Sequence, residues 1–337
     1  MELSALEFAA GLVLVLAGSR RLPDGIDGLA ERLRVSSGHL GLLMALGANS
    51  PEITAAVTAL VSGKHDAGYG VVFGSNLFNL AGLLGVGALV AGRVELRRPT
   101  LALHGGVAVA ITVAAIAVVF GWLPPYAAAL LISLFFAPYF VLLGLSPATL
   151  SRLPGGSVLA SAVSEEERAG REEKAERDER EHDRDEPAST GGIARLLAPS
   201  LIAIIVGGII VMRGALDLAA RIGVSGFLVG ALLLAALTGL PNVYTALRLA
   251  RDGRGRAVVS ETLNSNTLNL IVGIALPALV FGAAGTGAGV ELTAAMLLAA
   301  TLVALGLTAI GGGLRRRGGL VVVGLYLAFV LAAVLVS

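Results

Sequence analysis

Residues 47–52 (GANSPE) place a proline and a glutamate inside an apolar stretch of the chain. A proline inside a helix leaves the carbonyl four residues earlier, here that of Gly47, without its amide partner. Glu52 lies about 13 residues into the stretch, which at about 1.5 Å per residue is near the middle of a bilayer. An ionised carboxylate there costs about 2.5 kcal/mol or more unless it meets a partner or water. The pattern favours a cation ligand or a proton carrier over a carboxyl group held only by its neighbours.

Two pairs of serine and asparagine are each spaced by four residues, Ser75 with Asn79 and Ser265 with Asn269. This spacing puts hydroxyl and amide oxygens on one face of a helix. Such hard oxygens suit Na⁺ and Ca²⁺ rather than soft metals. Hydrogen bonding between membrane helices is the alternative role. Because the four residues are arranged as a repeat, the sequence favours a cation site.

The motifs recur after 190 positions. The aligned pairs are Pro51 and Pro241, Ser75 and Ser265, Asn76 and Asn266, and Asn79 and Asn269. In the second copy Thr238 and Asn242 lie close to the proline, and the carbonyl expected to lose its amide partner is that of Leu237. We therefore expect one site built from both copies.

The composition indicates an integral membrane protein. The 337 residues are 55% hydrophobic and 15% charged, with 45 glycines and no cysteine. A soluble domain is about 45–50% apolar and about 25% charged. The lack of cysteine excludes disulfides and thiolate metal sites. No basic run with interleaved aromatic residues points to nucleic acid, and no nucleophile–base constellation supports an enzyme.

Apolar runs and their polar breaks predict an all-α integral membrane protein with ten transmembrane helices, five in each half. The spans are 5–22, 39–62, 68–91, 99–121 and 125–146, then 193–213, 225–249, 257–281, 290–311 and 318–336. The first span of each half can continue into an amphipathic stretch, at 23–34 and at 214–222. The lipid bilayer is therefore an expected partner.

A charged linker separates the halves. Residues 164–186 hold 12 of the 24 acidic residues together with six Lys or Arg. This charge excludes the stretch from hydrocarbon, so it is either a solvated helix or a disordered segment. The predicted domains are 1–146, the linker 147–192, and 193–337.

Basic residues set the orientation of these spans. The loops on the linker's side carry Arg20, Arg21, Arg32, Arg34, Arg93, Arg97, Arg98, Arg248, Arg251, Arg254, Arg256, Arg315, Arg316 and Arg317, and the opposite loops hold little beyond Lys64 and Arg221. The positive-inside rule then puts the linker in the cytoplasm and both termini outside the cell (inner) membrane. Since each half has an odd number of spans, the second copy is inverted, which is typical of secondary transporters.

The paired motifs resemble the alpha-repeats of the sodium/calcium exchanger family, in the cation/calcium antiporter superfamily. The pattern G-[TS]-S-x-P-E followed by G-S-N-x-x-[ND] is matched by Gly47, Pro51, Glu52, Gly74, Ser75, Asn76 and Asn79, then by Thr238, Pro241, Ser265, Asn266 and Asn269. The linker stands where the family has its cytoplasmic loop, and the resemblance covers essentially the whole chain.

The resemblance implies a cation antiporter without a cofactor. Spans two, three, seven and eight would hold the ions, and spans one and six would slide across them. It places Glu52, Asn79 and Asn269 at central ligand positions and Ser75 and Ser265 at flanking ones. Thr238 and the carbonyls near Gly47 and Leu237 would complete the cage.

Departures from the family pattern bear on the cargo. Asn242 and Asn269 stand where the family has, or often has, acids, and Ala48, Asn49 and Gly239 replace small hydroxyl residues. Asn49 and Asn242 stay in the candidate ligand set. Dehydrated Ca²⁺ beside one carboxylate leaves a net positive charge in a low-dielectric interior, which is costly. The single carboxylate favours Na⁺ or H⁺ as the transported ion, whereas the resemblance to the family favours calcium.

Two other functions are compatible with the sequence. One is exchange of a monovalent cation against H⁺ or another monovalent ion, and another is a non-transporting paralogue that binds a cation or a partner. Glu261, one turn before Ser265, is either a second acid of the site or a helix N-terminal carboxylate. Asp27 and Asp217 are expected at solvated span ends. Nothing in the sequence predicts an oligomeric state.

Overall fold

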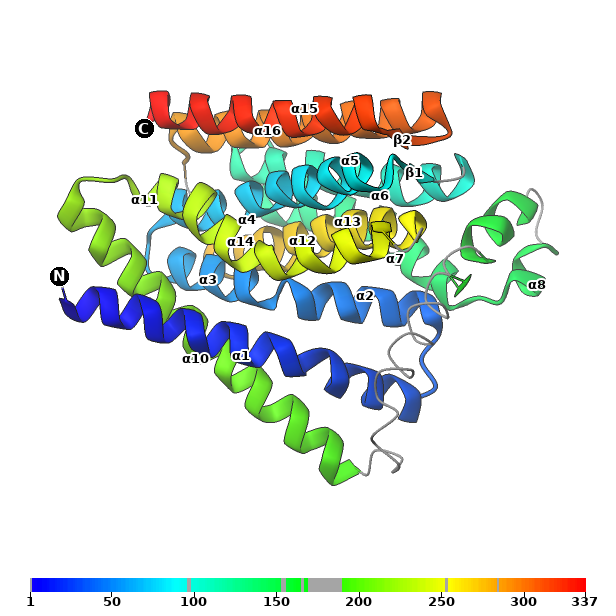
Figure 1. Cartoon of the computed structure of the whole chain (residues 1–337), viewed down its shortest axis with the longest axis horizontal. Helices are drawn as coiled ribbons and strands as arrows, with labels where there is room; N and C mark the ends of the chain where they lie inside the picture. Colours follow the sequence, from blue (N-terminus) through cyan, green and yellow to red (C-terminus); the bar gives the residue numbers. More distant parts are fainter. Residues whose placement is uncertain are drawn as a thin grey trace.

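The computed structural model describes residues 2–95, 98–152, 156–164, 167–168, 190–251, 254–283 and 285–337. The charged linker predicted at 164–186 therefore lies almost entirely outside the described residues. The rest of the chain is mostly helical (Figure 1). The only strands within the described ranges are two of three residues each.

The first half contains the helices α1 (Glu2–Arg32), α2 (Ser37–Ala48), α3 (Ser50–Val61), α4 (His65–Asn79), α5 (Gly87–Ala91), α6 (Arg98–Val119), α7 (Pro125–Gly144) and α8 (Pro147–Leu150). A π-helical segment, η1 (Leu80–Val86), joins α4 to α5, and strand β1 (Arg93–Glu95) follows α5. Residues 156–164 are also helical. The amphipathic stretch predicted at 23–34 continues α1 without interruption as far as Arg32.

The second half contains α10 (Thr190–Ile222), α11 (Gly226–Leu228), α12 (Ala235–Arg251), α13 (Gly255–Leu270), α14 (Leu276–Phe281), α15 (Ala288–Gly311) and α16 (Arg316–Val336). Two further π-helical segments, η2 (Val229–Leu234) and η3 (Ile271–Ala275), precede α12 and α14, and strand β2 (Gly313–Arg315) precedes α16. The stretch predicted at 214–222 continues α10 in the way that 23–34 continues α1.

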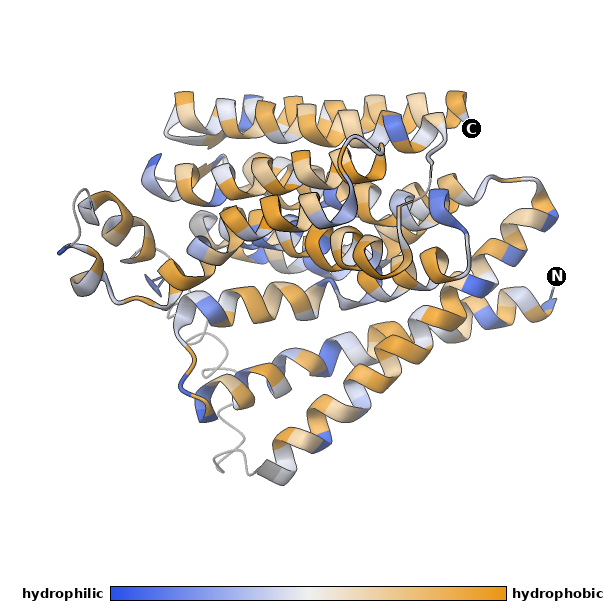
Figure 2. Cartoon of the chain, turned by 180° about the vertical axis from the view of Figure 1, so that it is seen from behind, coloured by the Kyte–Doolittle hydropathy of each residue, from blue (hydrophilic) through white to orange (hydrophobic). Residues whose placement is uncertain are grey.

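Nine helices of the described chain are long and apolar enough to cross a membrane. A tenth span results if α2 and α3 are counted together, because they form a pair bent by 54° at a one-residue break. The predicted span at 39–62 is this bent pair. Large apolar side chains such as Leu134, Ile310 and Leu335 are exposed on the outside, where lipid would cover them (Figure 2).

The two repeat prolines behave differently. Pro51 stands in the first turn of α3, immediately after the 54° bend. Pro241 lies inside α12, which continues through it as helix. The two prolines therefore stand in different settings, one after a break between helices and the other within a continuous helix. The π-helical segment η2 lies just upstream of α12.

The other irregularities follow the repeat. The segment η1 begins after Asn79 and η3 begins after Leu270, so π-helical turns occur at equivalent places in both copies. Each copy also ends its short following helix at a glycine with a positive φ, Gly92 (82°) and Gly282 (79°). Glycine adopts this conformation without steric cost and commonly ends helices.

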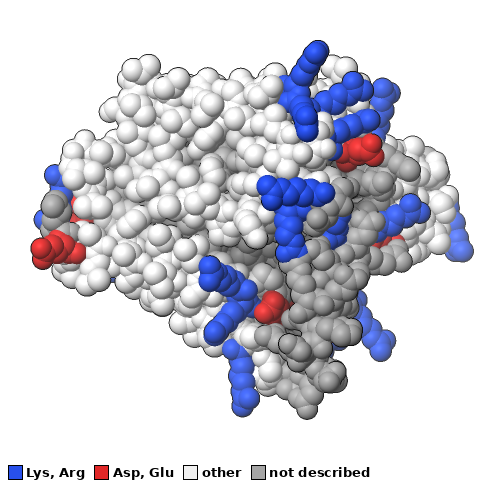
Figure 3. All heavy atoms as spheres, in the orientation of Figure 1, with Lys and Arg blue, Asp and Glu red and all other residues white. Residues whose placement is uncertain are grey.

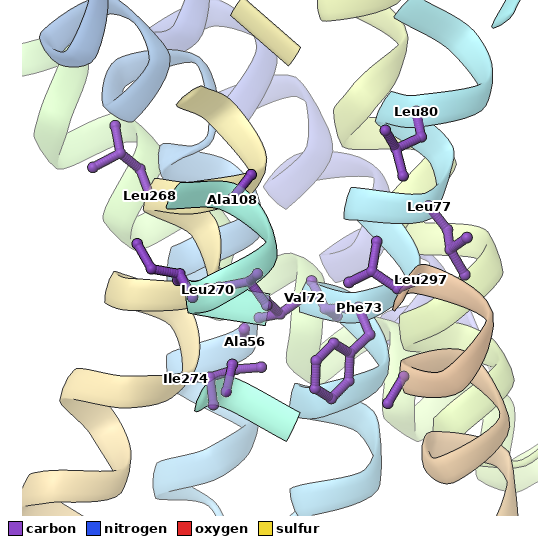
Figure 4. Packing of buried hydrophobic residues seen from close by; sticks show 14 of the residues in the cluster. Ala56, Val72, Phe73, Leu77, Leu80, Ala108, Leu268, Leu270, Ile274 and Leu297 are labelled. Carbon is purple, nitrogen blue, oxygen red and sulfur yellow. The ribbon is translucent and has the colours of Figure 1, made fainter. Parts of the chain in front are cut away.

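Helices α4 and α13 pack against each other, and they also contact α2, α3, α6, α12 and α15. Buried apolar side chains from α3, α4, α6, α13 and α15 meet there, among them Ala56, Phe73, Ala108, Leu270 and Leu297 (Figure 4). Nearly every side chain of α4 is buried. The core thus holds the two helices with the Ser/Asn pairs in place from several sides.

Helices α1 and α10 cross as a pair along one side of this core (Figure 1). Their backbones touch at small residues, since a Cβ atom on Gly11 would stand 2.4 Å from Val211 N and one on Gly207 would stand 2.8 Å from Gly11 O. The pair contacts the core through α2 and α3. Small residues allow this close packing in a membrane.

The short strands β1 and β2 pair antiparallel, with Val94 opposite Leu314. Both of these side chains are fully buried, and Arg93 Nη2 donates to Gly311 O (3.1 Å) and to Gly312 O (2.9 Å). The pair links the loop after α5 to the loop after α15. The all-α prediction missed it because three-residue strands have no measurable alternation of polar and apolar residues.

The packing predicts different effects for alanine at two glycines. A Cβ atom at Gly74 would stand 2.3 Å from Ala231 O, whereas one at Gly106 would meet nothing within 4 Å. We expect Gly74→Ala to destabilise the protein by about 1–3 kcal/mol through overpacking. Gly106→Ala should be neutral, or stabilising by about 0.5–1 kcal/mol, since alanine favours helix. Thermal unfolding in detergent measures both, and equal melting temperatures would contradict the packing of α4 on η2.

Candidate cation site

The two central helices meet at the asparagines of the G-S-N and N-S-N motifs. Asn76 Nδ2 donates to Asn266 O and Asn266 Nδ2 donates to Asn76 O, both at 3.1 Å. A contact in which residue i bonds j and j bonds i in return is the signature of a local two-fold relation. These bonds fix the crossing point of α4 and α13.

A second set of amide hydrogen bonds surrounds this crossing. Asn269 Nδ2 donates to Ser75 Oγ and to Asn76 Oδ1, both at 2.8 Å. Asn79 Nδ2 lies 3.5 Å from Asn266 Oδ1. The amide donors are therefore directed across the interface. The side-chain oxygens Oδ1 of Asn79 and Asn269 have no hydrogen-bond partner, and both residues are fully buried.

Glu52 is fully buried in the first turn of α3. Neither carboxylate oxygen has a hydrogen-bond partner. Thr238 lies beside it, but the Thr238 hydroxyl donates to Leu234 O at 2.7 Å. Among the described residues, Glu52 is the only buried carboxylate.

Asn49 stands at the break between α2 and α3, one helical turn before Glu52. Its side chain is fully buried and bonds Ser265, with Nδ2 2.6 Å and Oδ1 2.8 Å from Ser265 Oγ. This contact joins the first copy of the motif to the second across 216 residues. It also orients Ser265, which lies one turn before Asn269.

The predicted carbonyl ligands and Asn242 are placed as follows. The carbonyl of Gly47 is not free, because Ser50 Oγ donates to it at 2.6 Å and the Asn49 backbone N–H also reaches it. Pro51 has no amide to offer this carbonyl, and these neighbouring donors bond it instead. Leu237 lies in the continuous helix α12. Asn242, at the position equivalent to Glu52, is buried, and its Nδ2 has no partner.

Four buried acceptor oxygens thus lack hydrogen bonds: both of Glu52 and the side-chain carbonyls of Asn79 and Asn269. They belong to α3, α4 and α13, and α4 packs against both of the others. A buried acceptor without a partner costs about 1–3 kcal/mol, and an unpaired charge costs more. A bound cation would satisfy acceptor oxygens of this kind. In the described part of the chain, no three His, Cys, Asp or Glu side chains are placed so that they could hold a metal ion, so a cation site here would rely on amides and hydroxyls.

The other acids suggested by the sequence lie outside this set. Glu261 and Asp27 are partly exposed. Asp217 is exposed, lies 3.6 Å from Arg221 Nη2, and accepts from Ser4 Oγ at 3.3 Å. Asp217 therefore stands at a solvated helix end, as expected. The buried oxygen cluster keeps a single formal negative charge.

A polar network next to the site was not found by sequence reasoning. Tyr139 OH donates to Asn264 Oδ1 and lies 2.8 Å from His104 Nδ1, and His104 Nδ1 lies 3.3 Å from Asn264 Oδ1. All three residues are buried. The network ties α6 and α7 to α13 at the residue before Ser265. The available signal was Asn264 itself, which stands where the first copy has Gly74.

The known proteins that this chain resembles are exchangers and antiporters. A family model described as "Sodium/calcium exchanger protein" matches residues 3–146 and 193–335. The putative antiporter CaxA of Alkalimonas amylolytica is 37% identical over 82 residues, which are 24% of this chain and 26% of that protein. The sodium/calcium exchanger MaX1 of Methanosarcina acetivorans is 25% identical over 142 residues, 41% of each chain. These matches thus span less than half of either relative.

Two solved structures share the fold. The H⁺/Ca²⁺ exchanger CAX superposes with a TM-score of 0.70 at 14% identity, over 99% of this chain and 87% of that one. The sodium-calcium exchanger NCX_Mj, soaked with Na⁺ and Sr²⁺, gives a TM-score of 0.58 at 20% identity, over 98% of both chains. At these identities the likeness concerns the fold alone.

The His104–Tyr139–Asn264 network gives a test of how α13 is held. Tyr139→Phe removes the hydroxyl that donates to Asn264 Oδ1, so we expect a loss of about 1–2 kcal/mol in the free energy of unfolding. Tyr126→Phe is the matched control because Tyr126 is exposed, and it should have no effect. A Tyr139→Phe protein with the melting temperature of the wild type would show that the network does not hold α13.

Proposed function

The chain belongs to the sodium/calcium exchanger family, and from that premise we propose that it is a secondary active cation antiporter that alternates access to one central site at Glu52. Membership of this family makes it a membrane transporter rather than an enzyme. The observation that carries the proposal is the set of four buried, unbonded acceptor oxygens on α3, α4 and α13. The matches to CaxA and MaX1 cover only part of those proteins, so the ions and their coupling are our inference.

In the proposed site, Glu52 supplies the charge and Asn79 and Asn269 supply neutral oxygens. Ser75 and Ser265 flank them, and Thr238 lies beside the carboxylate. The carbonyls of Gly47 and Leu237, together with Asn49 and Asn242, form the outer part of the site. The described residues give no reason to add a cofactor, and the transported cations are substrates.

The charge of the site favours a monovalent cargo. One Na⁺ or one proton neutralises the carboxylate of Glu52, whereas a dehydrated Ca²⁺ would leave a net charge of about +1 in a low-dielectric interior. Asn242 and Asn269 cannot supply a second negative charge. Calcium is the second candidate, since CAX, MaX1 and NCX_Mj are all described as calcium exchangers.

Helices α1 and α10 are proposed to move during transport. They cross at glycines, with Gly11 O only 2.8 Å from where a Cβ atom on Gly207 would stand. Apart from contacting each other, α1 and α10 contact mainly α2 and α3. Asn49 lies at the break between these two helices, and Glu52 lies on α3. Sliding of this pair over α2 and α3 would open the site to one side of the membrane and then to the other, as expected for repeats related by inversion.

The proposed orientation follows the distribution of arginine. Lys and Arg gather mainly at the end of the molecule that carries β1 and β2, with few at the opposite end (Figure 3). By the positive-inside rule this end, and the linker 147–192 with it, faces the cytoplasm, and both termini face outward. The two matched segments, 3–146 and 193–335, support the same division into two halves. A binding protein without transport activity would share this topology, so flux decides between the two.

Removing the charge tests the proposed site directly. We expect Glu52→Gln to reduce cation-driven exchange in proteoliposomes to the background of empty vesicles, because no other buried carboxylate of the described chain can replace it. Glu291→Gln is the matched control, since Glu291 lies exposed in the first turn of α15. Flux of Glu52→Gln at the wild-type level would rule out the site.

The ion selectivity follows from the same charge. In wild-type proteoliposomes we expect Na⁺ flux driven by a pH gradient or by another monovalent ion to exceed Ca²⁺ uptake driven by a Na⁺ gradient. Asn242→Asp places a second carboxylate at the equivalent position and should raise the ratio of Ca²⁺ to Na⁺ flux by roughly tenfold, which corresponds to about 1.4 kcal/mol. Rapid Ca²⁺ exchange by the wild type, unchanged in Asn242→Asp, would contradict the charge argument.

A further inference from the structure

The side-chain nitrogen of Asn49 is surrounded by three oxygens. Nδ2 lies 2.9 Å from Ala45 O, 3.1 Å from Ser265 O and 2.6 Å from Ser265 Oγ. Two of these are backbone carbonyls and the third is a hydroxyl, and Asn49 is fully buried. Carbonyl and hydroxyl oxygens are the ligands that hard cations take in proteins. An amide NH₂ group can also bond such oxygens, because it is a donor with two hydrogens.

The equivalent place in the second copy is built differently. Gly239 stands 190 residues after Asn49 and has no side chain to offer. A Cβ atom there would lie 3.7 Å from Asn79 Oδ1 and 2.7 Å from Cδ1 of Phe78. Asn79 Oδ1 is one of the acceptors without a hydrogen bond. One copy therefore presents an amide donor to its oxygens, and the other leaves a buried oxygen open beside a glycine.

We propose that the amide of Asn49 takes the place of a cation in the first copy and so reduces by one the number of cations that the site can hold. This inference rests on the proposed function, because it presumes that the pseudo-symmetric oxygens are cation ligands. The amide also keeps Ser265 in position when no cation is bound. The open acceptors of Glu52, Asn79 and Asn269 are then left for the transported ion.

The number of buried negative charges also favours a site with fewer cations. Each additional cation in a buried site needs an additional negative charge or a large number of oxygens, and the described chain buries only Glu52. A neutral NH₂ group shares its two hydrogens among the three oxygens around it without adding charge. Asn49 is thus a residue in the outer part of the site that determines ion stoichiometry.

Two substitutions at Asn49 test the proposal without relying on transport. Asn49→Asp keeps the shape of the side chain but turns the donor into an acceptor, so four oxygens face one another unless a cation binds between them. Asn49→Ser removes the amide without adding charge. For the purified full chain in detergent, the free energy of unfolding is measured against NaCl concentration, with choline chloride keeping the ionic strength constant. The slope of this energy against the logarithm of the Na⁺ concentration gives the number of Na⁺ ions bound by the folded state.

We expect this slope to rise by about one ion in Asn49→Asp, which adds both an acceptor oxygen and a negative charge, and to stay at the wild-type value in Asn49→Ser, which adds no charge. Asn264→Asp is the matched control, since Asn264 is also buried in the membrane part of α13 but contacts Tyr139 and His104 instead of a ring of carbonyls. Its slope should equal that of the wild type. A wild-type slope in Asn49→Asp overturns the proposal, and so does an equal gain in Asn264→Asp. If Asn49→Asp does not fold in choline chloride, folding on addition of NaCl supports the proposal, and failure to fold in both salts overturns it.

The same data separate this proposal from the function on which it rests. A wild type that shows neither Na⁺ or Ca²⁺ stabilisation nor any cation flux refutes the proposed antiport. A wild type that binds and transports cations, with no change of slope at position 49, refutes only the role of Asn49.

Discussion

The buried, uncompensated carboxylate of Glu52 is the constraint on which the rest of the site depends. A charge without a partner in a low-dielectric interior is strongly unfavourable, and Asn79 and Asn269 on the neighbouring helices α4 and α13 add two more buried acceptors without donors. Hydrogen bonds within the protein do not relieve this excess of acceptors, because the amide donors of Asn76, Asn266 and Asn269 are directed across the α4–α13 interface. This excess of buried acceptors is the basis for proposing a cation site here.

The remaining architecture holds these residues in place. Reciprocal bonds between Asn76 and Asn266 fix the crossing of α4 and α13, and π-helical turns follow at equivalent places. The bend at Asn49 brings Glu52 to the start of a helix beside Thr238. The pair α1–α10 lies against the helices that carry these residues, which is where a moving element would control access.

Much of the fold could be predicted from the sequence, because the lengths of the apolar runs indicate the spans. The sequence also singles out Glu52 by its place in an apolar run and Ser75, Asn79, Ser265 and Asn269 by the 190-residue repeat, and the structure buries all five side chains. The features that escaped prediction depend on contacts between distant segments. The bond between Asn49 and Ser265 requires the bend after Ala48, the His104–Tyr139–Asn264 network joins three helices, and α12 continues through Pro241 as helix. No local pattern specifies which donors will reach the carbonyl of Gly47.

We propose that the buried oxygens around Glu52 hold one monovalent cation. Equilibrium binding of radiolabelled Na⁺ to the purified chain tests this most directly, with unlabelled Na⁺, Ca²⁺ and choline as competitors over a range of pH. We expect saturable binding of about one Na⁺ per chain, displaced by Na⁺ and by protons but much less by Ca²⁺, because one carboxylate neutralises one monovalent charge. Absence of saturable Na⁺ binding, or displacement by Ca²⁺ at concentrations far below those of Na⁺, would contradict a site for one monovalent cation.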